Sequence, residues 1–99
     1  MTLIYLEEAR RELLEAVAYY ERCGEGLGGR FFNEIQAGED AILRMPEAWG
    51  KLHGAFRRKL LQRFPYGLIY RVLGKGTIEV VAVAHLHRQP NYWLSRKQG

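Results

Sequence analysis

The spacing of apolar residues changes near the middle of this chain. Up to Met45 they recur every three or four positions, whereas from Phe56 to Ala84 they alternate or run continuously. The first spacing places one face of a helix against a core, and alternation is typical of a strand. The chain is therefore expected to have a helical half followed by a β half, which is the α+β class.

Two helices are predicted in the first half, after a short edge strand at residues 2–5. The first runs from Leu6 to about Arg22, and Gly24 can end it. The second is expected from about Arg30 to Met45, because Pro46 cannot continue it. The glycine-rich stretch 24–29 is interpreted as a flexible elbow of an αα-hairpin. The predicted inward stripes are Leu6, Ala9, Leu13, Val17 and Tyr20, and then Phe32, Ile35, Ile42 and Met45. Gly38 is expected to let the first helix approach closely.

Three antiparallel strands are predicted in the second half, at residues 56–63, 66–73 and 78–84. The near-continuous apolar run of the third indicates a strand covered on both faces. A short helix is expected at residues 91–97. The prediction is one domain over residues 1–99, with two layers: an N-terminal strand and an αα-hairpin packed on an antiparallel β-meander.

Charge is divided unevenly between the two halves. Residues 1–49 hold ten acids against five bases, and residues 50–99 hold ten bases against one acid, Glu79. Bases that alternate with apolar residues favour a sheet with a cationic face, which suits a polyanion or an acidic protein. The candidate binding residues are Arg57, Arg58, Lys59, Arg63, Arg71, Arg88 and Trp93. The alternatives are a merely solvated basic strand and, for the aromatics, a place in the core.

Several classes of protein are disfavoured by simple counts. The single cysteine, Cys23, allows no internal disulfide. No signal peptide is expected, because the charged residues Glu7, Glu8, Arg10 and Arg11 interrupt any apolar run near the N-terminus. No stretch approaches the ~20 apolar residues that span a bilayer. His85 and His87 lack the further ligands of a metal site, so no metal or cofactor is expected. The expectation is a cytoplasmic protein that does not enter a membrane.

Three separated features of the β half together resemble a known family. They are Arg-Phe-Pro-Tyr-Gly-Leu-Ile-Tyr-Arg-Val at residues 63–72, Ile-Glu-Val-Val-Ala-Val-Ala-His at residues 78–85, and His87-Arg88-Gln89-Pro90 followed by Trp93. This order is similar to the RelE/ParE superfamily of bacterial toxins, and most similar to its ParE-type plasmid-stabilisation branch. The resemblance implies the toxin half of a type II toxin–antitoxin pair, neutralised by a small acidic antitoxin and free of metal or cofactor.

The resemblance leaves the target open between two branches. ParE-like members poison DNA gyrase, whereas RelE-like members cleave mRNA in the ribosome. If the chain were such a nuclease, the candidate catalytic residues would be Arg57, Lys59, Arg63, His87 and Tyr92. However, Gly67 occupies a position where the nucleases commonly have an arginine. Leu86 lies near the position where a second arginine would be expected. A ParE-like role without hydrolysis is therefore favoured, with the nuclease and a small non-toxic nucleic-acid-binding module as alternatives.

The surroundings of Arg88 will show whether its role is structural or functional. If it pairs with an acid from the N-terminal half, its role is structural. If it lies free in a groove, it is available to a partner.

Overall fold

The computed structural model describes residues 1–96, which form two helices and a five-stranded sheet. The elements follow the order β1 (Thr2–Tyr5), α1 (Glu7–Cys23), α2 (Leu27–Arg44), β2 (Lys51–His53), β3 (Phe56–Leu60), β4 (Tyr66–Leu73), β5 (Thr77–His85) and a 3₁₀ helix (Leu94–Arg96). This arrangement confirms the α+β class. Within the described residues, no helix has both the length and the apolar character that crossing a bilayer requires.

The strands lie in the order β1-β5-β4-β3-β2. The four strands from β2 to β5 pair antiparallel, as the predicted meander requires, whereas β1 pairs parallel to β5 from Thr2 opposite Thr77 to Tyr5 opposite Val80. The sheet is therefore mixed. Its last strand, β2, is short and exposed, and the sequence did not predict it.

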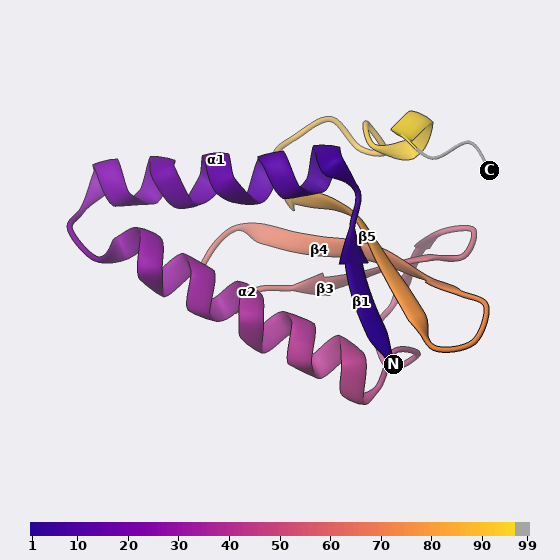
Figure 1. Ribbon diagram of the computed structural model, residues 1–99. Coiled ribbons are helices and arrows are strands. Elements are labelled where there is room, and N and C mark those ends of the chain that lie inside the picture. Colours follow the sequence, from indigo (N-terminus) through magenta and orange to yellow (C-terminus); the bar gives the residue numbers. More distant parts are fainter. Residues whose placement is uncertain (97–99) are drawn as a thin grey trace.

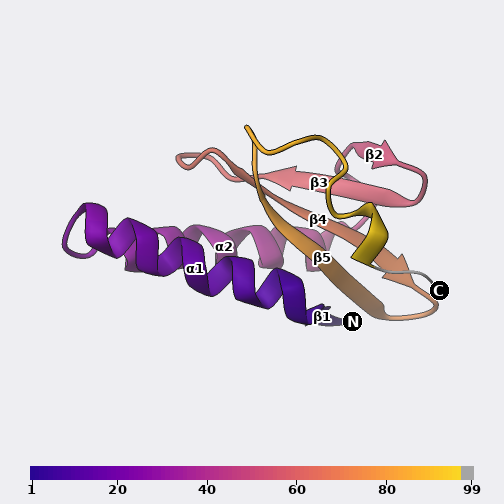
Figure 2. The same cartoon turned by 90° about the horizontal axis from the view of Figure 1, so that it is seen from above.

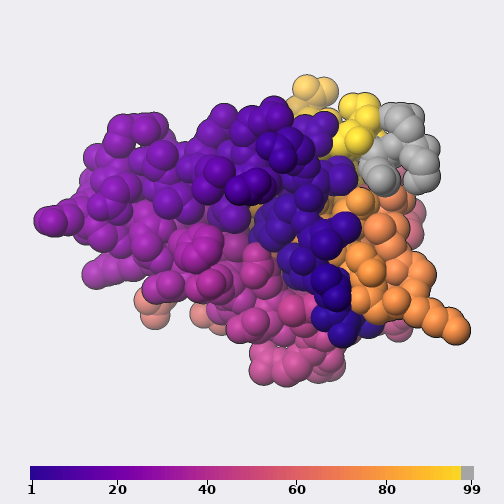
Figure 3. Space-filling model, viewed as in Figure 1, coloured from indigo at the N-terminus to yellow at the C-terminus, as the bar shows by residue number. Residues whose placement is uncertain are grey.

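The two helices lie side by side on one face of the sheet (Figures 1 and 2). We call this side the helical face. The segment of residues 86–96 crosses the opposite side, which we call the open face, and both views place it away from α2. In the space-filling view the helices hide most of the sheet, and the tip of their hairpin extends beyond it (Figure 3).

Apolar side chains fill both sides of the sheet. The larger cluster joins the helices to the helical face and includes Phe31, Ile35, Leu68 and Tyr70. A smaller cluster on the open face places Trp93 over the sheet with Ile69, Val81, Ala82 and Ala84. Because β5 contributes to both clusters, the expectation that this strand is covered on both faces is confirmed.

Several expected boundaries and facings were wrong. The second helix begins three residues earlier than expected, and the strand expected to end at residue 63 ends at Leu60. Phe31 takes the core position expected for Phe32, which is exposed, and Met45 lies beyond the helix and is exposed. A 3₁₀ turn at residues 94–96 takes the place of the expected final helix, whose last residue lies outside the described part.

The connection between the helices, expected as a flexible elbow, is a short turn in which Glu21 accepts backbone hydrogen bonds. Gly26 adopts a left-handed conformation, with φ of 81°, which glycine allows without strain. The Glu21 carboxylate accepts hydrogen bonds from the backbone N–H groups of Gly26 and Gly28, each at 3.0 Å. These N–H groups lie at the start of α2, where the helix itself provides no acceptor and the helix dipole favours an acid.

Gly28, not Gly38, allows the two helices to approach closely. A Cβ on Gly28 would lie 2.6 Å from the Val17 carbonyl oxygen of α1. A Cβ on Gly38 would instead lie 3.0 Å from Leu68 of the sheet. The expectation that Gly38 faces the first helix was therefore wrong, and Gly38 brings α2 close to β4.

We predict that Gly28→Ala destabilises the protein by about 1–3 kcal/mol, because the added methyl group must push α2 away from α1. Gly29→Ala is the matched control, since a Cβ at that helical position meets nothing within 4 Å. It should instead gain up to about 1 kcal/mol from the better helix propensity of alanine. Urea unfolding of both variants measures the difference, and equal stabilities would contradict the assigned contact.

Candidate functional site

The interior strand β5 has a stretch of backbone beyond the end of β1 that no neighbouring strand covers on that side. β1 pairs with β5 only as far as Val80, and a bulge follows, since Ile69 and Tyr70 of β4 face Ala82 and Val80. Two side chains take the place of the missing strand. Glu12 of α1 accepts a hydrogen bond from the Val83 N–H at 2.9 Å, and Arg96 donates one to the Val81 carbonyl at 3.1 Å.

Glu12 also collects three side chains from the C-terminal segment. The guanidinium of Arg96 donates to both carboxylate oxygens, at 2.9 and 2.6 Å, and the Tyr92 hydroxyl donates at 2.7 Å. Arg88 lies 3.6 Å away and remains 52% exposed, whereas the Glu12 side chain is only 13% exposed. Arg88 is thus paired with an acid from the N-terminal half, which was the criterion for a structural role.

Burial and the Glu12 contact both raise the pKa of the Tyr92 hydroxyl well above its ordinary value. The hydrogen bond to Glu12 likewise raises the pKa of Arg96. The Arg88 guanidinium also lies over the Tyr92 ring, with its Cζ 3.8 Å from the ring centroid. Tyr92 therefore keeps its proton at neutral pH and directs it at a carboxylate of its own chain.

The candidate bases of β3 do not form one cationic face. Arg57 donates to the carbonyls of Glu47 and Trp49, at 3.2 and 2.7 Å, and the Lys59 ammonium lies 4.4 Å from the centre of the Trp49 ring. Together with a 2.5 Å hydrogen bond from the Tyr70 hydroxyl to Pro46, these contacts secure the chain that follows α2.

Other candidates are also engaged or separated. Arg71 forms a 3.0 Å ion pair with the buried Glu79 on the open face. Trp93 is 2% exposed and lies inside the smaller core cluster, so its ring is not at the surface. Arg63 is exposed on the loop after β3, where its backbone N–H donates to Glu34 of α2.

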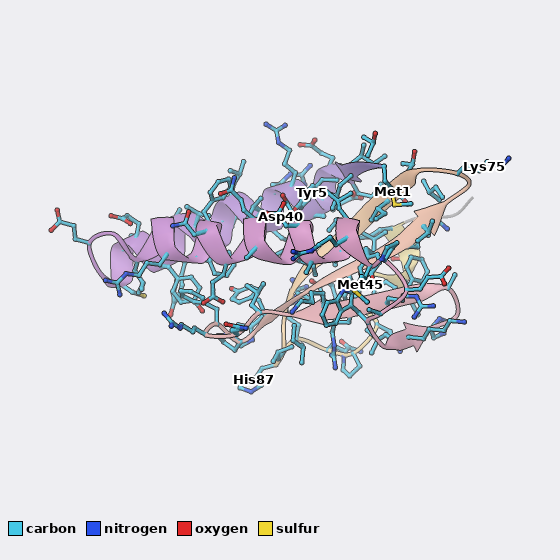
Figure 4. The ribbon with its side chains drawn as sticks, turned by 90° about the horizontal axis from the view of Figure 1, so that it is seen from below. Met1, Tyr5, Asp40, Met45, Lys75 and His87 are labelled. Carbon is cyan, nitrogen blue, oxygen red and sulfur yellow. The ribbon has the colours of Figure 1, made fainter. Side chains whose placement is uncertain are left out.

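The two histidines lie at the end of β5. The His85 ring packs edge-on against Tyr66, and its Nδ1 accepts a hydrogen bond from the His87 N–H at 3.0 Å. The His87 side chain projects away from the rest of the molecule (Figure 4). Across residues 1–96, no three side chains of the metal-binding types gather closely enough to hold an ion.

Arg58 differs from its neighbours on β3. It lies on the open face, partly buried, in a pocket of about 110 Å³ that Arg88 also lines. Its stem crosses Gly67, where a Cβ would lie 2.9 Å from the Arg58 Cγ. Among the described residues, no acid and no hydrogen-bond acceptor contacts its guanidinium.

Sequence reasoning missed Glu12, the residue that organises this region. It sits beside the buried stripe of α1, and it is absent from the predicted inward stripe and from the candidate site residues. Its one signal is its place in the helix, one position before Leu13, at the border of the buried stripe. The pattern of α1 contains no indication that Arg96, 84 residues later, would reach it.

Comparison with solved structures finds a chain with a similar fold. A chain from a structure titled "Chromosomal ParDE TA system from P. aeruginosa" superposes with a TM-score of 0.64 at 16% identity, over 88% of this chain and 97% of that one. At that identity the match establishes the fold. A search of curated proteins gave no match.

A family model defines the class more closely. The model described as "ParE toxin of type II toxin-antitoxin system, parDE" matches residues 3–90. The chain therefore belongs to the ParE toxin family, as the motifs at residues 63–72 and 78–93 indicated. Membership of this family implies an antitoxin as partner.

We predict that Glu12→Gln destabilises the protein by about 3 kcal/mol, because it removes the charge that neutralises Arg96, whose side chain is 14% exposed. Amide hydrogen exchange should rise mainly in residues 86–96 and at Val83. Glu15→Gln, on an exposed turn of the same helix, should change stability by less than about 0.5 kcal/mol. Uniformly faster exchange along α1, with no preference for the C-terminal segment, would contradict the proposed organisation.

Proposed function

We propose that this chain is the toxin of a ParDE-type pair, that it inhibits DNA gyrase in the cytoplasm without hydrolysing nucleic acid, and that a small acidic antitoxin neutralises it. The observation that carries the proposal is the match of the ParE toxin family model over residues 3–90.

The contacts of the nuclease candidates support a role without hydrolysis. Cleavage of RNA without a metal needs a base, an acid and cations placed around one phosphate. Here Tyr92 donates to Glu12, whereas Arg57 and Lys59 hold the chain after α2 on the helical face. The His87 side chain projects away from the rest of the molecule (Figure 4). These contacts direct the side chains to different partners, which favours a role without hydrolysis.

The surface that remains available suits an acidic protein partner. Two of the predicted binding residues, Arg63 and Arg88, are exposed, and the partly buried Arg58 lines a surface pocket together with Arg88. Arg63 also lines a largely apolar groove between α2 and the loop after β3, whose other lining residues are Leu27, Arg30, Asn33, Glu34 and Phe64. An antitoxin helix or strand with an apolar side and acidic flanks would fit such a groove, with attraction between unlike charges increasing the rate of association.

We predict that induced expression in bacteria arrests growth, and that gyrase-dependent DNA cleavage or loss of supercoiling appears while total mRNA stays intact. The readouts are plasmid topology and RNA integrity from the same culture. Co-expression of the cognate antitoxin, sought as a short acidic reading frame adjacent to the gene, should restore growth. Codon-spaced mRNA cuts with normal topology would overturn the proposal in favour of the nuclease alternative.

We predict that Tyr92→Phe keeps at least half of the growth arrest, after correction for protein level, because its hydroxyl serves Glu12 and not a substrate. Removing that hydrogen bond to a charged carboxylate should cost stability by about 1.5–3 kcal/mol. Tyr19→Phe, at an exposed position of α1, is the control. Loss of arrest in Tyr92→Phe at normal stability, with Tyr19→Phe unaffected, would assign Tyr92 a direct functional role.

A further inference from the structure

The pocket on the open face has an apolar floor and polar donors at its mouth. Ile69, Ala84 and Trp93 line it from the sheet and the smaller core cluster. Arg58 enters from β3, and Arg88 enters from the C-terminal segment. Of the described residues that line the pocket, none is an aspartate or a glutamate.

Within residues 1–96, Arg58 is a cation held in place without a counter-charge. Its stem is confined against Gly67, and its side chain is partly removed from water. A guanidinium in such a place is stabilised by an anionic partner, because burial weakens its hydration while ordering of the stem has already reduced its freedom. The Arg88 charge, in contrast, is already shared with Glu12 at 3.6 Å.

The rim of the pocket adds apolar surface. Leu52 of the edge strand β2 and Leu86 after β5 are both exposed, and both line the pocket. An occupant should therefore present an anionic group next to an apolar one. Peptides that contain an acid beside a leucine or similar residue have this combination, whereas the neighbours of a nucleic-acid phosphate are polar sugars.

We propose that this pocket binds a carboxylate side chain of an acidic protein segment, with Arg58 as its partner and the flanking apolar side chain resting on Leu52 or Leu86. One free guanidinium matches the single charge of a carboxylate. Nucleic-acid binding, in comparison, gains its affinity from many phosphate contacts, and Arg57, Lys59 and Arg71 are engaged within the protein. That the segment belongs to the antitoxin rests on the proposed function, whereas the chemistry of the pocket does not.

The test is a titration of the full-length isotope-labelled protein by NMR. The probe is the peptide acetyl-Leu-Glu-Leu-amide, and acetyl-Leu-Gln-Leu-amide is its uncharged match. We expect the Glu peptide to shift the Arg58 side-chain Nε–H and the amides of Ala84 and Leu86, and to bind at least about tenfold more tightly than the Gln peptide. Equal responses to the two peptides would overturn the proposal without any variant being made.

Variants identify the cation. Arg58→Gln should weaken binding of the Glu peptide at least about tenfold, whereas Arg10→Gln, which removes the same charge from an exposed position of α1, should leave it unchanged. Arg58→Lys should restore part of the affinity, since it keeps the charge and loses the fork of donors. If both glutamine variants lose affinity equally, net charge explains the binding and the pocket is not the site.

Inorganic phosphate, added at constant ionic strength, separates the second source of an anion. Shifts at the same residues with phosphate but none with the Glu peptide would make this a phosphate site and overturn the carboxylate assignment. The titration uses neither growth arrest nor an antitoxin. A negative result therefore overturns the pocket and leaves the proposed function standing, and a failed induction assay leaves the titration decisive for the pocket.

Discussion

The contact between Glu12 and Arg96 closes the sheet where β1 stops. A central strand with unpaired backbone groups is costly when it is shielded from water, because each unmatched N–H or C=O forgoes a hydrogen bond. Glu12 supplies the acceptor for Val83 and Arg96 supplies the donor for Val81. This pair of side chains replaces about one strand residue, and it does so while joining α1 to the end of the chain.

This arrangement explains the course of the C-terminal segment. Arg96 and Tyr92 both donate hydrogen bonds to Glu12. Trp93, which lies between them in the sequence, packs its ring into the smaller core cluster instead. The segment is thus held at its polar side by one carboxylate and at its apolar side by the sheet. The C-terminal segment therefore lies across the open face next to β3, and the pocket beside Arg58 forms between the two.

The elements with a strong period were predictable from the sequence. The inward stripe of α1, the alternation in β4 and the apolar run of β5 each depend on local spacing, and each was placed correctly. The three residues of β2 carry too little pattern to predict, and the early start of α2 was hidden by glycines that ordinarily weaken a helix. Gly28 is tolerated there because its missing side chain admits Val17, which is a tertiary reason that a local pattern does not contain.

The site was predictable in composition and not in arrangement. Ten bases in the second half suggested one cationic face, but alternation along β3 sends neighbouring bases to opposite faces of the sheet. On the helical face Arg57 and Lys59 meet backbone carbonyls and an aromatic ring, and on the open face Arg71 meets the one acid of that half, Glu79. Gly67 then decides the fate of Arg58, since any larger residue would displace its stem. The residue that stands where a nuclease commonly has an arginine thus gives its space to another arginine, which reaches the same face from the neighbouring strand.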